Sequence, residues 1–204
     1  MKKSFNAFTL AEVLITLGII GVVAAMTMPT LMNSTNGAQY KAAYKKALSA
    51  ISQGVTLNVA LDGDSFAEAG AETILPSRMN IVKTTTDGLG YSISSTDANL
   101  KNATSGNTTL FFNDGTVFQF ITGKTECTMT STDSSKNTGC KGFLDVNGAK
   151  GPNKEVKCDG GGSTATTHGT SCEVSNPTDI YPVIYYDQTI MPNSSAAKAV
   201  LYGK

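Results

Sequence analysis

The sequence predicts an α+β protein in which one long N-terminal helix packs against a small antiparallel β-sheet domain with disulfide-bonded loops. Three observations support this fold class. Residues 8–28 form an apolar run with a single charge, and the next thirty residues or so show helical periodicity. The remainder alternates short apolar runs with turn residues and contains four cysteines. About 140 residues follow the helix, which is enough for one small domain.

Residues 8–32 are predicted to be the membrane-spanning part of the helix, because this stretch can cross a hydrocarbon core of ~30 Å. The single charge is Glu12. A charge inside a span costs roughly 2.5–3.5 kcal/mol, so we expect a partner that compensates this carboxylate. Gly18 and Gly21 would let another membrane helix approach closely. Together with Pro29, which lacks a backbone donor, they make residues 18–29 the weakest part of the helix.

The run Ala7-Phe8-Thr9-Leu10-Ala11-Glu12-Val13-Leu14, continued by residues 18–25 and Pro29, resembles the leader and transmembrane helix of type IV prepilins and type II secretion pseudopilins. The resemblance covers about the first thirty residues. In that family a membrane aspartyl peptidase cuts just before the Phe, and the new amino group is methylated. The resemblance therefore implies a leader of residues 1–7, cleavage between Ala7 and Phe8, and N-methylation of Phe8. Ala7 stands where the family usually has Gly.

The same resemblance implies a function. In the family, the carboxylate equivalent to Glu12 meets the Phe amino group of a neighbouring subunit, and two opposite charges desolvated together lose less than either alone. Gly18, Gly21 and Pro29 would belong to the same assembly segment. The chain is thus expected to be a structural subunit of a type II secretion pseudopilus or type IV pilus-like filament, not an enzyme. Its expected partners are other pilin subunits, the prepilin peptidase and the inner-membrane assembly platform.

The resemblance also implies a single-pass protein of the inner membrane, with Lys2 and Lys3 in the cytoplasm and the domain periplasmic or extracellular. Two other interpretations of the N-terminal segment stay open. One is a secretory signal peptide cleaved near residues 23–25, and the other is a plain membrane anchor. Glu12 counts against both. A third alternative keeps the family but makes the chain a minor pilin that acts as a binding or adhesion module.

Residues 33–61 are predicted to continue the helix in amphipathic form. Apolar residues at helical spacing are Tyr40, Tyr44, Ala47, Leu48, Ile51, Val55 and Val59, and the polar side holds Lys41, Lys45, Lys46, Gln53 and Asn58. Asp62-Gly63-Asp64 should end the helix at about Leu61. Residues 62–204 would then be the exported domain. Packing a sheet on this half of the helix would bury four of the apolar residues: Tyr44, Leu48, Ile51 and Val55.

Strand signals follow in the domain. Residues 109–112 and 117–121 flank Asn113-Asp114-Gly115-Thr116, which predicts a hairpin with a tight turn. Residues 143–146 predict a short strand, and residues 180–190 another, which Pro182 would place at a sheet edge. Ser194-Ser195 could cap a last helix over residues 196–202, ended by Gly203.

The four cysteines, Cys127, Cys140, Cys158 and Cys172, lack the C-x2-C spacing of zinc sites and lie among polar residues. Disulfides in an exported domain explain them better than buried thiols. Three pairings exist. We favour Cys127 with Cys140 and Cys158 with Cys172, because each bond would close a polar loop.

One segment, Asp145-Val146-Asn147-Gly148, is similar to Asp-x-Asn-Gly segments of pseudopilin-like proteins, some of which bind calcium. It lacks the third acidic position and the final Glu of an EF-hand loop, and its turns form without a metal. The residues to test as calcium ligands are Asp145, Asn147, Glu155 and Asp159. No other cofactor is expected.

Composition and motifs point to no further function. Sixteen basic and sixteen acidic residues balance, so nothing indicates a nucleic-acid partner. No G-x-S-x-G, H-E-x-x-H, C-x-x-C or phosphate-binding glycine loop is present. The one histidine, His168, lies in a Gly/Thr-rich stretch and is expected to be a solvated loop residue.

Overall fold

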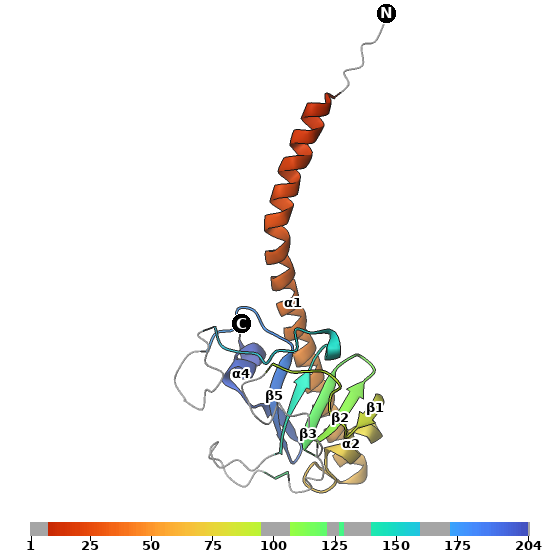
Figure 1. The fold of residues 1–204 in the computed structure, drawn as a ribbon. Helices are drawn as coiled ribbons and strands as arrows, with labels where there is room; N and C mark the ends of the chain where they lie inside the picture. The colour runs from red at the N-terminus through yellow and green to blue at the C-terminus, as the bar shows by residue number, and fades with distance from the viewer. Residues whose placement is uncertain (1–7, 95–106, 122–126, 129–139, 160–171, 204) are drawn as a thin grey trace, which may run out of the picture. The chain divides into compact units, whose positions relative to one another are not determined.

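The computed structural model describes residues 8–94, 107–121, 127–128, 140–159 and 172–203 (Figure 1). The leader with Ala7, and His168, therefore lie outside the described residues. The chain divides into two compact units, residues 1–36 and 37–204, and each is described by itself. Helix α1 (Leu10–Asp62) contributes to both.

In the first unit, α1 is helical throughout, with Pro29 inside the helix. Gly18 and Gly21 also lie within regular helix. A proline in a helix interior removes one hydrogen bond and costs roughly 3 kcal/mol. The predicted weak segment is therefore helical here despite its composition.

In the second unit, α1 ends where the sequence predicts. Gly63 has a φ of 87° and its N–H donates to the Val59 carbonyl at 3.1 Å. Glycine adopts this left-handed conformation without a Cβ penalty, which makes it a common helix terminator. The last helical residue, Asp62, lies one position beyond the predicted end.

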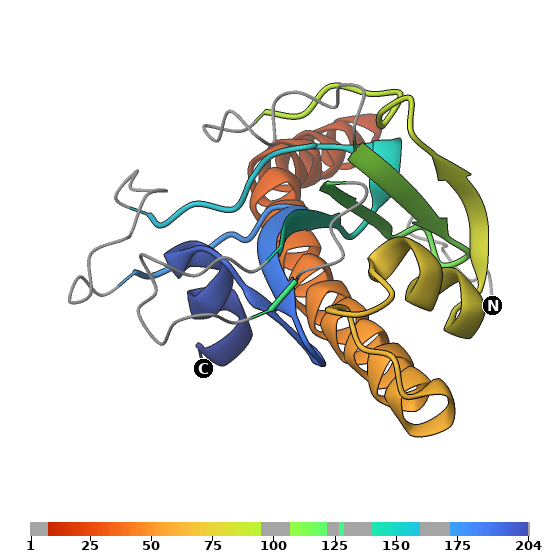
Figure 2. The ribbon, with the colours of Figure 1, turned by 90° about the horizontal axis from the view of Figure 1, so that it is seen from below.

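The second unit is built on a six-stranded antiparallel sheet in which every strand pairs with the next one along the chain (Figures 1 and 2). Its strands are β1 (Ile81–Thr85), β2 (Asn107–Phe112), β3 (Val117–Ile121), β4 (Cys140–Asp145), β5 (Ile180–Tyr186) and β6 (Thr189–Pro192). The other elements are α2 (Ala71–Arg78), the short 3₁₀ helix η1 (Gly148–Lys150) and α4 (Ser195–Tyr202). The predicted α+β class is confirmed.

The main core lies between α1 and one face of the sheet. Tyr44, Leu48, Ile51 and Val55 are all buried, as predicted. Tyr44 stacks on Tyr181 of β5 with ring centroids 3.9 Å apart, which holds the helix against this strand. The opposite face is covered by a smaller cluster: Leu89, Val117, Phe143 and Ile180, with Tyr91, Ile93 and Phe111 packed against it.

The predicted hairpin is β2 and β3, with Phe111 opposite Val117. Gly115 has a φ of 89°, and the Asp114 carboxylate accepts the Thr116 N–H at 3.1 Å. Asp114 also forms an ion pair with Lys46 at 2.8 Å. The turn is thus tied both to itself and to α1.

The prediction of a single edge strand over residues 180–190 is wrong in two respects. It is two strands, joined at Asp187, whose φ is 44°. β5 also lies inside the sheet, between β4 and β6, and not at an edge. Pro182 is tolerated there because its carbonyl accepts the N–H of Asn193, just past the end of β6. The N–H that proline lacks would point to the same side, just beyond the last β5–β6 pair, Val183 with Pro192, so the gap falls at the end of that ladder.

Three local differences complete the comparison. Asn58, predicted on the polar side of α1, is buried, because its amide donates to the Asp64 carbonyl and its oxygen accepts from Arg78. Helix α2 and strand β1 have no counterpart among the predicted elements. The last helix is confirmed, with Ser194 as its N-cap accepting the Ala197 N–H at 3.0 Å.

Candidate functional site

The N-terminal end of α1 is closed by a reciprocal capping arrangement. The Thr9 N–H and hydroxyl both donate to Oε2 of Glu12 at 2.9 Å, and the Glu12 N–H donates to the Thr9 hydroxyl at 3.3 Å. This pattern satisfies backbone donors that have no partner inside the helix. The Glu12 charge is therefore met partly within its own chain. Both contacts from Thr9 use Oε2, and neither uses Oε1.

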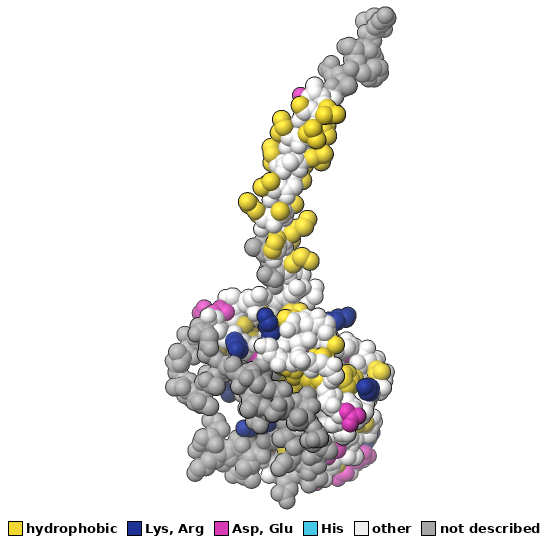
Figure 3. Space-filling view, in the orientation of Figure 1, with side chains coloured by type: hydrophobic (Ala, Val, Ile, Leu, Met, Phe, Trp, Pro, Cys, Tyr) yellow, Lys and Arg dark blue, Asp and Glu magenta, His cyan; other side chains and the backbone are white. Residues whose placement is uncertain are grey.

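Residues 10–29 of α1 are long and apolar enough to cross a membrane, with a mean hydropathy of 2.2. Hydrophobic side chains cover the face of this part seen in Figure 3. The two threonine hydroxyls of this segment do not need water as a partner. The Thr16 hydroxyl donates to the Glu12 carbonyl and the Thr27 hydroxyl to the Val23 carbonyl, both at 3.0 Å. Each hydroxyl is satisfied inside the helix, as a span requires. Only the Glu12 carboxylate offers charge in this segment.

Gly18 and Gly21 have open space around them. A Cβ built on either residue meets no atom within 4 Å. Replacement by a larger residue would therefore leave the isolated helix unstrained. A neighbouring helix that packs against these positions would be one reason for glycine there.

A second polar site surrounds Asp145 at the end of β4. Its Oδ1 accepts the N–H groups of Asn147 and Gly148 at 3.1 and 2.9 Å, and its Oδ2 accepts the Tyr91 hydroxyl at 2.6 Å. The carboxyl is fully buried. Burial raises its pKa to about 6, against the opposing effect of the Tyr91 hydrogen bond. The side chain holds the turn that follows β4.

Asp179 completes this site from the start of β5. Its carboxylate accepts the N–H groups of Asn153 and Lys154 at 2.7 and 2.9 Å. Sequence reasoning missed both Asp179 and Tyr91. The available signal was weak: Asp179 is an acidic residue directly before a strongly apolar run. Two buried carboxylates thus fix the segment between β4 and β5 through its own backbone.

The four predicted calcium ligands are distributed over separate places. Asp145 and Glu155 lie on opposite sides of Ile180, which pairs with both. The Asp159 carboxylate instead accepts hydrogen bonds from the N–H and the hydroxyl of Ser175. Among the described residues, no group of three or more His, Cys, Asp or Glu side chains is placed to hold a metal ion. The four residues together do not fit one calcium ion, and calcium binding itself stays untested.

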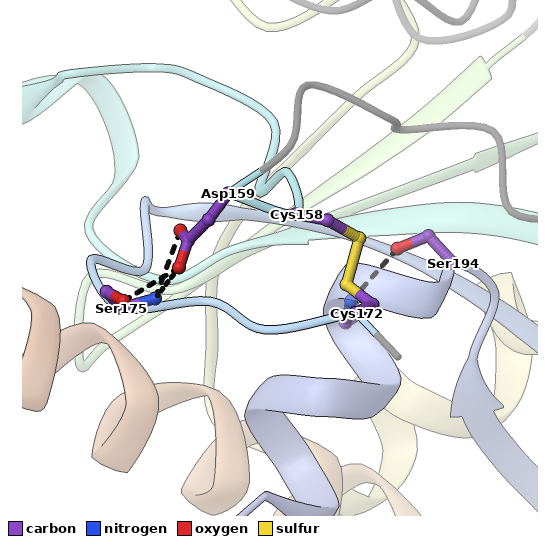
Figure 4. The surroundings of a disulfide bond; sticks show 6 residues. Cys158, Asp159, Cys172, Ser175 and Ser194 are labelled. Carbon is purple, nitrogen blue, oxygen red and sulfur yellow. Dashed lines mark hydrogen bonds between the residues drawn. A yellow bond between two sulfur atoms is a disulfide. The ribbon is translucent and has the colours of Figure 1, made fainter. Parts of the chain in front are cut away.

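Two disulfides are present and join the cysteines in the favoured pairs. Cys127–Cys140 is buried in the main core, where Cys140 opens β4. Cys158–Cys172 is half-buried at the border of the same core. Figure 4 shows the second bond beside Asp159 and Ser175.

The comparisons with known proteins concern the N-terminal segment. Residues 2–28 match the family model of the prokaryotic N-terminal methylation motif. Comparisons with curated proteins and with solved structures gave no match. The matched residues include Phe8, the Thr9–Glu12 cap and both glycines of the span. The N-terminal segment therefore carries a prokaryotic N-terminal methylation motif, which supports a prepilin-like or pseudopilin family.

Proposed function

We propose that this chain is a structural subunit of a type II secretion pseudopilus or type IV pilus-like filament, assembled through its N-terminal helix. The observation that carries the proposal is Glu12, the only charge in the apolar residues 10–29 of α1, which lie largely within the methylation motif. Cleavage before Phe8 would create an amine one residue from Thr9. The free Glu12 Oε1 of one subunit then pairs with the Phe8 amine of the next.

Electrostatics favours this pairing in the membrane. The Thr9 cap supplies two neutral donors but no positive charge, so the carboxylate still lacks a counter-charge. In a low-dielectric environment an opposite charge within a few ångströms is strongly favoured. The chain would sit in the inner membrane with its domain exported, and the assembly platform would deliver it to the filament.

The test separates membrane insertion from assembly. Glu12→Ala and Glu12→Gln should reach the membrane as well as wild type, because each removes a costly charge. Both should be lost from sheared filaments, since the partner amine is left uncompensated. Thr16→Val, one turn along the same helix, is the matched control and should assemble normally. Normal incorporation of the Glu12 variants would refute the proposal.

Processing provides an independent check. Mass spectrometry of the native protein should find an N-methylated Phe8 as the first residue. A chain that starts after Ala25 would establish a secretory signal peptide, and a retained Met1 would establish a plain anchor.

A minor pilin that binds a surface or a secretion substrate is the second candidate. Its support is the pair of disulfides, which close two loops between residues 127 and 172. If this chain is a minor pilin, deletion of its gene should alter adhesion or substrate release, while filaments of the major subunit persist.

A further inference from the structure

The two disulfides of this chain differ in their surroundings. Cys127 is fully buried and Cys140 is 8% exposed, and both belong to the core between α1 and the sheet. Cys140 also pairs with Tyr185 in the β4–β5 ladder. A reductant reaches this bond only if the core opens. Cys158 and Cys172 lie at the border of the core and are half-buried.

An open hollow reaches the second bond. It has a volume of about 400 Å³, and its lining includes Cys172, Glu173, Ser175, Lys41 and Gly203. The Lys41 ammonium donates to the Gly203 carbonyl at 3.1 Å, so one positive group stands in the wall. A small dithiol fits a space of this size, since an enclosed cavity of about 150 Å³ already holds benzene. Cys172 belongs to the lining, whereas Cys158 does not.

Hydrogen bonds beside the bond hold the two chain segments together independently of sulfur (Figure 4). The Asp159 N–H donates to the Glu173 carbonyl at 2.9 Å. Ser175 donates its N–H to both oxygens of the Asp159 carboxylate, at 3.2 and 3.1 Å, and its hydroxyl to Oδ2 at 2.7 Å. We call these contacts of Asp159, Glu173 and Ser175 the clamp. With the clamp closed, the two thiols of a reduced pair stay at a high effective concentration.

We propose that Cys158–Cys172 is a reversible thiol–disulfide exchange site for a dithiol, whereas Cys127–Cys140 is a permanent bond of the core. A thiolate of the dithiol attacks Sγ of Cys172, the S–S bond breaks, and Cys158 leaves as a thiolate that takes a proton from water. The second thiol of the dithiol then loses its proton and attacks the dithiol's first sulfur, which is bonded to Cys172 in the mixed disulfide. This step closes the dithiol into a disulfide and releases Cys172 as a thiolate that takes up a proton. Two electrons and two protons reach the protein, and the dithiol becomes a disulfide.

The oxidised state is the resting one. The contacts of Asp159, Glu173 and Ser175 hold the two chain segments together without sulfur, so the sulfurs of a reduced pair stay close to each other. Such a pair returns to the disulfide when the reductant is removed.

The experiment uses the full-length chain in detergent with dithiothreitol as the reductant. Samples are taken over time, alkylated with iodoacetamide and digested, and each cysteine is quantified by mass spectrometry. Cys158 and Cys172 should become labelled at least about tenfold faster than Cys127 and Cys140, because reduction of the core bond requires local opening. Equal rates, or faster labelling of the core pair, would overturn the proposal.

A second measurement tests the clamp. After removal of dithiothreitol, wild type should re-form Cys158–Cys172, and Asp159→Ala should do so several-fold more slowly. Asp64→Ala, which changes an exposed aspartate, is the control and should match wild type. Protection of Cys127–Cys140 in the same samples reports that the variants are folded. Re-formation at the wild-type rate in Asp159→Ala would refute the role of the clamp.

Discussion

The carboxyl of Asp145 gives the protein a pH dependence that one substitution should remove. It is buried, it accepts hydrogen bonds from two backbone N–H groups and from Tyr91, and burial raises its pKa from 3.8 to about 6. Between these pH values the folded state binds more protons than the unfolded state. The free energy of unfolding should therefore fall as the pH rises from about 4 to about 6.

The magnitude follows from the same shift. A difference of about two pH units corresponds to a loss on the order of 3 kcal/mol, complete at about pH 7. Asp145→Asn cannot titrate, but its oxygen still accepts the Asn147 and Gly148 N–H groups and its amide can donate to Tyr91. Its stability relative to wild type should therefore increase by about that amount between pH 4 and pH 7.

The assay is urea unfolding of both full-length proteins in detergent with EDTA, at pH values from 4 to 7. Near-UV circular dichroism is suitable because the chain has seven tyrosines and no tryptophan. Asp114→Asn is a control of opposite sign. Although burial raises the pKa of Asp114, hydrogen bonds from Lys46 and Thr116 lower it more, so its net pKa lies below the usual value. A stability difference for Asp145→Asn that is constant with pH, or that shrinks as the pH rises, would refute the reasoning.

Three further predictions concern other parts of the chain. Thr9→Val should weaken the N-terminal cap of α1 by about 0.5–2 kcal/mol and speed amide exchange over residues 10–13. Thr9→Ser keeps the hydroxyl and should behave as wild type. Unchanged exchange in Thr9→Val would show that the cap is dispensable. Gly142→Ala should lower the free energy of unfolding by roughly 1–3 kcal/mol, because the added Cβ would collide with the Gln119 carbonyl oxygen. Lys141→Ala, at the neighbouring exposed position, is the control. Equal urea midpoints for the two variants would contradict this account. Replacing EDTA by calcium should leave the urea midpoint of unfolding unchanged, because the predicted ligands lie apart. A midpoint that rises with calcium concentration to saturation, and that no longer rises in Asp145→Asn, would instead establish the calcium site.

Features that depend on neighbours along the chain could be predicted from the sequence. Glu12 within an apolar run indicated the assembly segment, and the family match covers it. The turn at Asp114-Gly115 and the cap at Ser194 are set by residues within three positions of one another. Each of the two disulfides joins cysteines only 13 or 14 residues apart, so local loop closure was a sound guide to their pairing.

Features that depend on sheet order required the structure. The partner of Asp145 at Tyr91 is 54 residues distant, and Asp179 reaches the same segment from β5, so no spacing rule connects the three. Pro182 gave the wrong position for its strand, because a missing N–H is also tolerated at the end of a ladder, and Pro182 lies just beyond the last β5–β6 pair, Val183 with Pro192. The sequence by itself determined the long helix, the hairpin and the caps, since short-range backbone chemistry specifies them, and it carried the methylation motif of residues 2–28. Only the tertiary structure decided which buried carboxylates share a loop and which disulfide borders an open hollow, because packing between distant segments sets both.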